Sequence, residues 1–520
     1  MVRQSMLAAG MVLVLGAAGF SQVVAHTTGE LPEDPTPAPK PKGLQPVRTG
    51  IASSDGALLA FSQDAFEFGI NYDQVPRSPA FFTDLAAALG KPVSELEPRG
   101  KQSRYWREPV SVEAGSRARA VQRRWKADGV SLRPVTIRRY PLGEAAAGLI
   151  GDVRNGTPAN GIERALALDS KDGEGPSEVV LTIDSKIQLA AMSAIRRAVV
   201  SNMAKQGAAV VVDPASGDLL AVAAWPTFDP DDPGKGTDLN AATMLAFEPG
   251  STFKIITTAL ALDKGMISTD TTVNCPGSVV VGKHTIHCSH GAHGTISASD
   301  VVARSCNVAA ARWGMQIGQE EMRESIDLLG LLDPPGLGLP GERAGSVNDR
   351  ETATRLQAAN WGFGQAMTCN PVALAAAYAG LANNGVISRP RLVARINGQD
   401  EPIREPRKVV SEQTAETMLD FMEQAVEGDH GTGKRLRISG YRLGGKTGTA
   451  QKLGAQKGKY VSNFVGYVPA HDTRAVVLVM VDSPTKGLYY GADVAGPVFQ
   501  ELAEVLIQRL GIPPSRRTGR

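Results

Sequence analysis

The chain has 520 residues, and its 55 lysines and arginines nearly balance its 53 aspartates and glutamates, giving a formal net charge of +2. This balance offers no electrostatic reason to expect a nucleic-acid partner. With 56 glycines and 33 prolines it is not a low-complexity chain, and a hydrophobic fraction of 42% can fill real cores. Four cysteines in so long a chain exclude a scaffold built on disulfides.

The amino-terminal segment has the charge order of an export signal. An apolar run from Leu7 to Phe20 follows Arg3, and no acidic residue occurs before Glu30. The segment ends in Val23-Val24-Ala25, which a signal peptidase could cut, whereas a spanning anchor needs about 20 apolar residues. We expect residues 1–25 to be a membrane anchor or a cleaved signal, and both alternatives stay open.

A linker and a smaller module follow. Six prolines between Glu30 and Pro46 predict an extended tether over residues 26–47. Residues 48–172 mix short apolar segments with glycine and proline breaks, which favours a small, irregular α+β module. Its basic stretch from Arg117 to Lys126 is interpreted as a solvated helix face, so we assign it no nucleic-acid role.

The clearest secondary-structure signals lie in residues 173–512. Val179 to Ile183 reads as a strand, and Asp184 is a suitable N-cap for the helix that follows it. Two apolar runs, Ala208 to Asp213 and Asp218 to Ala224, flank a Pro-Ala-Ser-Gly turn and predict an antiparallel hairpin.

More strands appear after a long helical region. Tyr460 to Val468 and Arg474 to Asp482 read as strands, and Val494 to Leu510 as a closing amphipathic helix. Strands at both ends with helices between them predict one antiparallel sheet built from distant segments and flanked by helices, in an α+β domain with a helical subdomain. Residues 513–520 form a basic tail.

The first chemical motif pairs a hydroxyl with an amine. Ser251-Thr252-Phe253-Lys254 follows Pro249-Gly250, which marks the start of a helix. On a helix Ser251 and Lys254 share a face, so a nucleophile lies beside a base.

Two further motifs carry polar groups that suit an amide substrate. Ser305-Cys306-Asn307 supplies a hydroxyl and a carboxamide. Lys446-Thr447-Gly448-Thr449 can form a strand with a cation and two hydroxyls, and its glycine admits a substrate backbone. Each motif alone is weak, but serine-lysine, then Ser-x-Asn, then Lys-Thr-Gly in this order is the combination of penicillin-binding proteins and class A β-lactamases.

The chain resembles the class B penicillin-binding proteins, which are D,D-transpeptidases that cross-link peptidoglycan. The resemblance covers Glu248 to Lys254, Ala303 to Asn307, Gly362-Phe363-Gly364-Gln365 and Gly445 to Gln451. In the amino-terminal part, Arg139-Tyr140-Pro141-Leu142-Gly143 with Gly151, and Arg48-Thr49-Gly50-Ile51, look like the class B signatures that β-lactamases lack.

The resemblance implies roles for the motif residues. Ser251 would attack the penultimate D-alanine of a stem peptide, Lys254 would deprotonate it, and Ser305 would relay the proton to the leaving amine. Asn307 would hold the peptide amide. The remaining substrate-binding residues would be Lys446, Thr447, Gly448 and Thr449. The resemblance requires no cofactor. It implies that residues 48–172 form a dimerisation or pedestal module and that residues 173–512 form the transpeptidase domain.

The resemblance also implies partners and a location. Peptidoglycan stem peptides and β-lactams would bind the site, and cell-wall elongation or division proteins of the membrane would be partners. The chain would be a single-pass protein of the cytoplasmic membrane with its catalytic domain on the extracytoplasmic side. The alternatives are a β-lactam hydrolase or sensor, and a non-catalytic cell-wall scaffold.

A cysteine and histidine cluster stands apart from these motifs. Cys275, Cys288, His290 and His293 could together bind zinc, or Cys275 and Cys288 could close a disulfide in an exported protein. A plain loop near the active-site entrance is the third alternative. Cys306 is interpreted as a small packed side chain.

Overall fold

The computed structural model describes residues 49–154, 156–169, 176–232, 234–289, 291–347, 355–403, 406–452 and 459–515. The predicted anchor or signal (residues 1–25) and the predicted linker (residues 26–47) lie outside the described residues. Among the helices of the described ranges, none has both the length and the apolar character needed to cross a bilayer.

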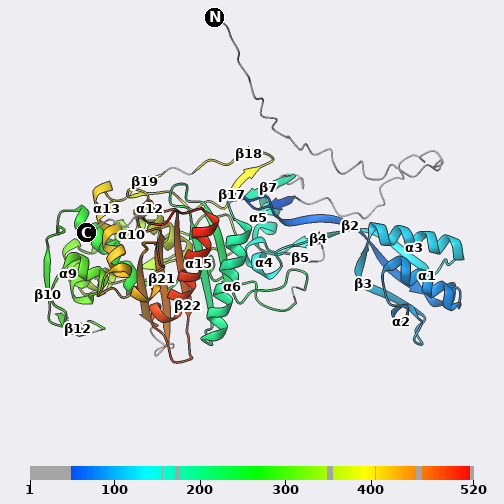
Figure 1. The fold of residues 1–520 in the computed structure, drawn as a ribbon, viewed down its shortest axis with the longest axis horizontal. Helices are drawn as coiled ribbons and strands as arrows, with labels where there is room; N and C mark the ends of the chain where they lie inside the picture. Colours follow the sequence, from blue (N-terminus) through cyan, green and yellow to red (C-terminus); the bar gives the residue numbers. More distant parts are fainter. Residues whose placement is uncertain are drawn as a thin grey trace, which may run out of the picture. The chain divides into compact units, whose positions relative to one another are not determined.

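A five-stranded antiparallel sheet forms the centre of the carboxy-terminal part (Figure 1). Its order brings together strands that are more than 200 residues apart in sequence, and it confirms the predicted sheet built from distant segments. The predicted hairpin is confirmed as the last two strands of that order. The strands in spatial order are β20 (Gly444–Gln451), β21 (Tyr460–Val468), β22 (Ala475–Asp482), β8 (Gln206–Val212) and β9 (Leu219–Trp225).

The inner strands β8 and β22 of this sheet are mostly apolar on both faces. Every residue of β8 and β22 is buried, as expected when helices cover a sheet on each side. Alternate residues enter different cores: Val210 and Leu478 face one, whereas Val211 and Val477 face the other. Each buried valine or leucine contributes about 1.5–3 kcal/mol, so both layers are needed to hold the sheet.

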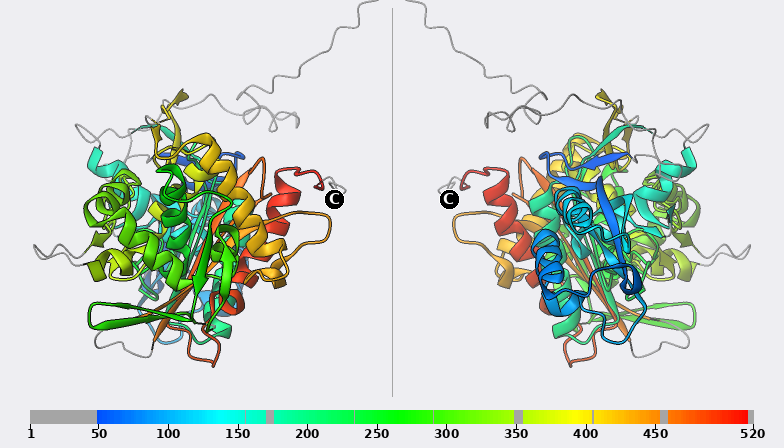
Figure 2. Two further views of the ribbon diagram at one scale, coloured as in Figure 1. Left: turned by 90° about the vertical axis from the view of Figure 1, so that its left-hand side faces the viewer. Right: turned by 90° about the vertical axis from the view of Figure 1, so that its right-hand side faces the viewer.

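Helices cover both faces of the sheet (Figure 2). On one face lie α6 (Ser185–Ser201) and the closing helix α15 (Gly496–Arg509). On the other lie α7 (Lys254–Asp263), α12 (Pro371–Ala382) and α13 (Glu412–Glu427). The predicted N-cap is confirmed, because the Asp184 carboxylate accepts hydrogen bonds from the first turn of α6; such a cap contributes about 1 kcal/mol.

A helical subdomain packs against α7. Its helices are α8 (Ala298–Ala303), α9 (Asn307–Ile317), α10 (Gln319–Leu328) and α11 (Arg355–Gly362). Two small antiparallel pairs border it: β10 (Thr272–Cys275) with β13 (Gly294–Ser297), and β11 (Ser278–Val281) with β12 (His284–His287).

The amino-terminal module is built on a second sheet. The long strand β2 (Leu58–Asn71) pairs with both β3 (Ser103–Ser111) and β4 (Val130–Arg139). Helices α1 (Pro79–Leu89) and α3 (Val112–Trp125) lie beside these strands and close a separate core (Figure 1). The predicted α+β module is confirmed. The basic stretch lies on α3 and its C-cap, with Arg117, Arg123, Arg124 and Lys126 exposed as predicted.

The second sheet also contains β1, at the start of the module, and three strands from outside the module. β1 (Gly50–Ala52) pairs with β2 and runs parallel to β7 (Glu178–Leu181), which in turn pairs with β17 (Val393–Ile396) and through it reaches β18 (Gln399–Asp400). The remaining short elements are η1 (Tyr72–Gln74), α2 (Val93–Leu96), α4 (Glu144–Ile150), β5 (Val153–Arg154), β6 (Thr157–Pro158), α5 (Gly161–Asp169), η2 (Gly250–Phe253), β14 (Ser346–Val347), β15 (Met367–Thr368), β16 (Val386–Ile387), β19 (Arg407–Lys408), η3 (Lys434–Leu436) and α14 (Gly491–Val494).

The structure gives a physical reason for Gly151 in the amino-terminal signature. Gly151 ends α4 with φ of +84°, and a Cβ there would lie 2.0 Å from the Asn160 carbonyl oxygen. Only glycine fits this turn. Nearby, Arg138 and Glu163 form a buried ion pair of 2.6 Å, and the Tyr140 hydroxyl donates to the same carboxylate. These contacts fasten the end of β4 to α5.

Candidate active site

Ser251 lies in a tight first turn. The sequence predicts a helix that starts here, and the structure refines this: η2 forms one 3₁₀ turn before α7 begins at Lys254. Gly250 opens the turn with φ of +56°, and a Cβ there would lie 3.2 Å from the Thr449 carbonyl oxygen. Glycine therefore lets the nucleophile-bearing turn approach β20 closely.

Lys254 joins the first two motifs. Its side chain is fully buried, and Nζ donates to Ser305 Oγ at 2.9 Å, to the Ser305 carbonyl at 2.7 Å and to Asn307 Oδ1 at 2.6 Å. Residues more than 50 positions apart thus share one amine. Burial lowers the pKa of Lys254 to about 8, and negative charge on Cys306 or Cys288 acts in the opposite direction. A lysine with this pKa is partly neutral near pH 7 and can accept a proton.

The backbone of Ser305 is held in an uncommon conformation. Its φ is +59°, in the left-handed region that costs a residue with a side chain about 1–3 kcal/mol. The next residues start α9, and Asn307 Nδ2 donates to the His287 carbonyl at 2.7 Å. The strain aims both the hydroxyl and the carboxamide at Lys254.

The third motif lies on β20, at the edge of the central sheet. Lys446 is buried, and its Nζ donates to the Thr447 carbonyl at 2.9 Å. Burial, and then the charge of Lys254, hold the pKa of Lys446 well below its usual value. The two buried amines therefore oppose each other's positive charge. At Gly448 a Cβ would lie 2.1 Å from Asn463 Oδ1, so the strand has no room for a side chain.

One open cavity of about 640 Å³ is lined by residues of all three motifs, although Lys254, Asn307 and Lys446 are not among its lining residues. Ser251, Ser305, Thr447 and Thr449 line it. Thr447 Oγ1 donates to Thr432 Oγ1 at 3.0 Å, and Thr449 Oγ1 accepts from the Gly491 amide at 3.0 Å, so both threonines are held by the walls. Because β20 is an edge strand, an extended peptide can pair with it by main-chain hydrogen bonds.

The cavity also contains residues that motif reasoning missed. Tyr460 and Tyr489 stack with ring centroids 4.1 Å apart on its wall, and Asp493 pairs with Arg435 at 3.2 Å on its rim. Thr432 comes from the loop after α13. No local sequence signal marks these positions, since only the folded sheet brings them beside β20.

The predicted metal ligands that the structure describes lie at the ends of short strands: Cys275 ends β10, Cys288 follows β12 and His293 precedes β13. Cys275 and Cys288 are buried thiols whose Sγ atoms lie 3.6 Å apart, well beyond the bond length of a disulfide, about 2.05 Å. His290 lies outside the described residues. Cys306 is buried, as predicted, and its Sγ lies 3.7 Å from Cys288 Sγ.

Two family models match the chain. The penicillin binding protein transpeptidase domain matches residues 207–504, and the penicillin-binding protein dimerisation domain matches residues 44–217. The first model covers the central sheet and all three motifs, and the second covers the amino-terminal signatures. The chain belongs to the class B penicillin-binding proteins. The predicted fold, a dimerisation module followed by a transpeptidase domain, is confirmed.

Individual relatives agree with this assignment. The chain is 30% identical over 514 residues to the probable peptidoglycan D,D-transpeptidase PbpC of Pseudomonas aeruginosa, covering 90% of this chain and 88% of the relative. Penicillin binding protein 3 of Mycobacterium tuberculosis, solved with ampicillin, superimposes with a TM-score of 0.72 at 26% identity, over 92% of this chain and 98% of that one. The same protein solved with aztreonam gives a TM-score of 0.71, over 91% and 98%.

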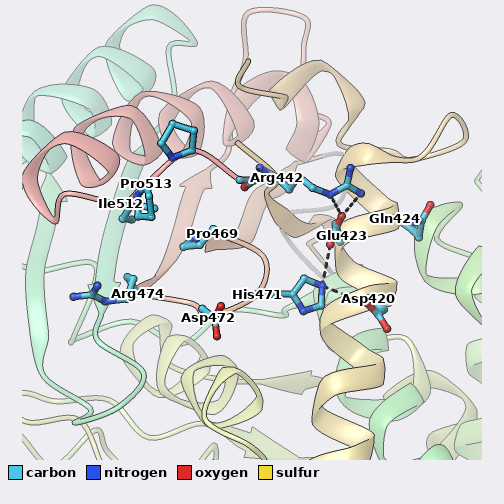
Figure 3. Close-up of a pocket in the computed structure, with 12 residues that line it drawn as sticks. Asp420, Glu423, Gln424, Arg442, Pro469, His471, Asp472, Arg474, Ile512 and Pro513 are labelled. Atoms are coloured by element: carbon cyan, nitrogen blue, oxygen red, sulfur yellow. Dashed lines mark hydrogen bonds and ion pairs between the residues drawn. The ribbon is translucent and has the colours of Figure 1, made fainter. Parts of the chain in front are cut away.

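A second and larger cavity, of about 1030 Å³, lies away from the motifs of this penicillin-binding protein (Figure 3). His471, in the turn between β21 and β22, meets the acidic face of α13 there. Its Nε2 lies 2.9 Å from Glu423 and 3.3 Å from Asp420, and Arg442 also pairs with Glu423. The hydrogen bond to Glu423 raises the pKa of His471 above its usual 6.5.

We expect this ion pair to make stability depend on pH. Because the folded-state pKa of His471 is raised, its contribution is fully present below pH 6.5 and is lost as the pH rises through the folded value. The midpoint of thermal unfolding should therefore fall less between pH 5.5 and 8.5 in His471→Gln than in the parent. The matched control is His284→Gln, an exposed histidine without an ion pair among the described residues. Equal pH slopes in parent and His471→Gln would contradict this assignment.

Proposed function

We propose that this penicillin-binding protein cross-links peptidoglycan stem peptides through a serine acyl-enzyme. The observation that carries the proposal is the shared amine: Lys254 donates hydrogen bonds to both Ser305 and Asn307. Ser251 lies three residues before Lys254 and lines the same cavity as Ser305. A nucleophile, a base with a lowered pKa and a relay hydroxyl thus meet beside an edge strand.

The acylation step follows from these positions. A stem peptide pairs with β20, and its terminal carboxylate meets Lys446, Thr447 and Thr449. Neutral Lys254 takes the proton of Ser251 as its oxygen attacks the penultimate D-alanine carbonyl. Main-chain N–H groups of Ser251 and Thr449 stabilise the oxyanion.

The remaining steps transfer the acyl group. Lys254 returns the proton through Ser305 to the departing D-alanine amine, whose bond to the carbonyl breaks. A second stem amine then attacks the ester carbonyl, the bond from the carbonyl to Ser251 Oγ breaks, and the proton that the amine loses returns through Lys254 to Ser251 Oγ. Asn307 orients the donor amide. A D,D-carboxypeptidase side reaction is water attacking the same ester.

Incubation with benzylpenicillin tests this chemistry against its nearest alternative, β-lactam hydrolysis. We expect intact-mass spectrometry to show one covalent adduct per chain that persists after excess drug is removed. Among the described residues lining the cavity, the one carboxylate, Asp493, is paired with Arg435, so no unpaired carboxylate there activates water. Turnover of a chromogenic cephalosporin at many molecules per enzyme each second would favour the hydrolase instead.

The non-catalytic scaffold and sensor alternatives predict a different outcome. Both would leave a stem pentapeptide unchanged, whereas a transpeptidase exchanges its terminal D-alanine for an added D-amino acid. We expect this exchange with the full chain, measured by mass spectrometry of the peptide. Its absence, with penicillin acylation intact, would favour the sensor.

We also propose that the chain is held at the extracytoplasmic face of the membrane by residues 1–25, with residues 26–47 as tether. The apolar run behind Arg3 and the proline-rich stretch support this arrangement. Partners of the elongation or division machinery would bind at the same membrane. We expect most of the protein in the membrane fraction with an intact amino terminus. Sequencing that finds a mature chain starting at His26 would mean that the segment is a cleaved signal.

A further inference from the structure

Three cysteines from separate segments meet behind the active site. Cys275 ends β10, Cys288 follows β12, and Cys306 caps the start of α9. All three are buried, and the Sγ atom of Cys288 lies 3.6 Å from that of Cys275 and 3.7 Å from that of Cys306. A fourth donor is close, because a ring nitrogen of His293 and the sulfur atoms of Cys275 and Cys306 all lie within 4.8 Å of one another.

Backbone hydrogen bonds hold these donors in place. The β10–β13 pairing sets Cys275 opposite Gly294, and the His293 amide donates to the Cys275 carbonyl at 3.1 Å. The Cys288 amide donates to the Gly277 carbonyl at 2.9 Å. These contacts fix the backbone beside Cys275, Cys288 and His293. Cys288 is not among the donors that lie within 4.8 Å of the His293 ring nitrogen, so the His293 side chain would have to turn toward it when the ion binds.

The sulfur spacings fit one tetrahedral metal ion better than a disulfide. Zinc binds thiolate sulfur at about 2.3 Å, so two sulfurs on a tetrahedron lie about 3.8 Å apart, close to the observed distances. A disulfide would need about 2.05 Å and would use only two of the three thiols. Three cysteines and one histidine are also a common donor set of structural zinc sites.

We propose that Cys275, Cys288, Cys306 and His293 bind one Zn²⁺ ion that positions the Ser305–Asn307 segment. This set keeps three of the ligands that the sequence suggests and replaces His290 by Cys306. Cys306 separates Ser305 from Asn307, the two residues whose side chains bind Lys254. An ion fixed to the residue between them would hold the strained backbone of Ser305 against relaxation. Binding releases the thiol protons to solvent.

Metal analysis of the full chain tests the binding. After purification in detergent and dialysis against zinc, then against metal-free buffer, we expect about one zinc per chain. Cobalt added to the metal-free chain should give the thiolate charge-transfer and visible bands of tetrahedral cobalt. Cys288→Ser and His293→Ala should each weaken zinc binding at least tenfold. Cys369→Ser, a buried cysteine outside the cluster, is the matched control and should bind as the parent does.

Three results would overturn the proposal. The first is a parent chain that holds no zinc and gives no tetrahedral cobalt spectrum. The second is zinc binding that Cys288→Ser and His293→Ala leave unchanged. The third is a Cys275–Cys288 disulfide, found as two thiols that resist alkylation until they are reduced. The cobalt spectrum needs no variant, so misfolding of a variant leaves the test intact.

The positioning role has its own measurement. Removing zinc with a chelator should slow acylation by benzylpenicillin at least tenfold, and adding zinc back should restore the rate. An unchanged rate in the metal-free chain would overturn the positioning role. Acylation of the parent by benzylpenicillin tests the proposed function separately from the ion. A metal-free chain that is still acylated at Ser251 remains a penicillin-binding enzyme, although it lacks zinc.

Discussion

Replacing Ser251 by alanine is expected to abolish covalent labelling by benzylpenicillin. The alanine variant keeps the 3₁₀ turn and the buried Lys254 but has no oxygen to attack the strained amide. Intact-mass spectrometry after incubation with the drug should show the unmodified mass only. In the parent, peptide mapping should place the adduct on the peptide that contains Ser251.

The control for this variant removes a hydroxyl elsewhere. Ser325→Ala takes a buried helical hydroxyl from α10, away from the cavity, and should be labelled at the parent rate. Circular dichroism establishes that both variants are folded. Label retained by a folded Ser251→Ala chain would assign the nucleophile to another residue and would remove the basis of the proposed mechanism.

The central sheet could be predicted because its strands depend on local pattern. Runs of valine and alanine such as Val210 to Val212 are typical of strands buried on both faces, and glycine-bearing turns separate them. The second sheet could not be predicted in the same way. Its β1, β7 and β17 are three or four residues long; β1 pairs with β7 across about 130 positions of sequence, and β7 pairs with β17 across more than 200. Such short strands carry too little pattern to reveal their partners.

The active site, too, could be predicted only in part from the sequence. The order of the three motifs predicts the chemistry of Ser251, Lys254 and Lys446. The burial of both lysines and the left-handed backbone of Ser305 depend on how α7, α9 and β20 pack, and no residue pattern encodes them. The interpretation of Cys306 as a packed side chain captured its burial but not its sulfur neighbours, because the three cysteines come from β10, the loop after β12 and the start of α9, which meet only in the folded chain.

Replacing Lys254 by arginine is expected to slow acylation by benzylpenicillin about 10³-fold while the chain stays folded. The parent lysine has a pKa of about 8 because it is buried, so a useful fraction is neutral at neutral pH. Arginine keeps its charge in proteins and cannot take the proton of Ser251. A missing general base costs about 10²–10⁴-fold. Stopped-flow acylation with a chromogenic cephalosporin measures the rate.

The matched control is Lys264→Arg at the other end of α7, where the cation pairs with Glu321. It makes the same change of side chain outside the cavity and should acylate within about threefold of the parent. Circular dichroism would show whether Lys254→Arg has lost its fold. In that case Lys254→Met replaces it, because this variant removes the amine without adding a charge, and its acylation should be equally slow. Acylation of a folded Lys254→Arg within tenfold of the parent rate would exclude Lys254 as the base. The hydrogen bonds to Ser305 and Asn307 would then leave it an electrostatic and positioning role.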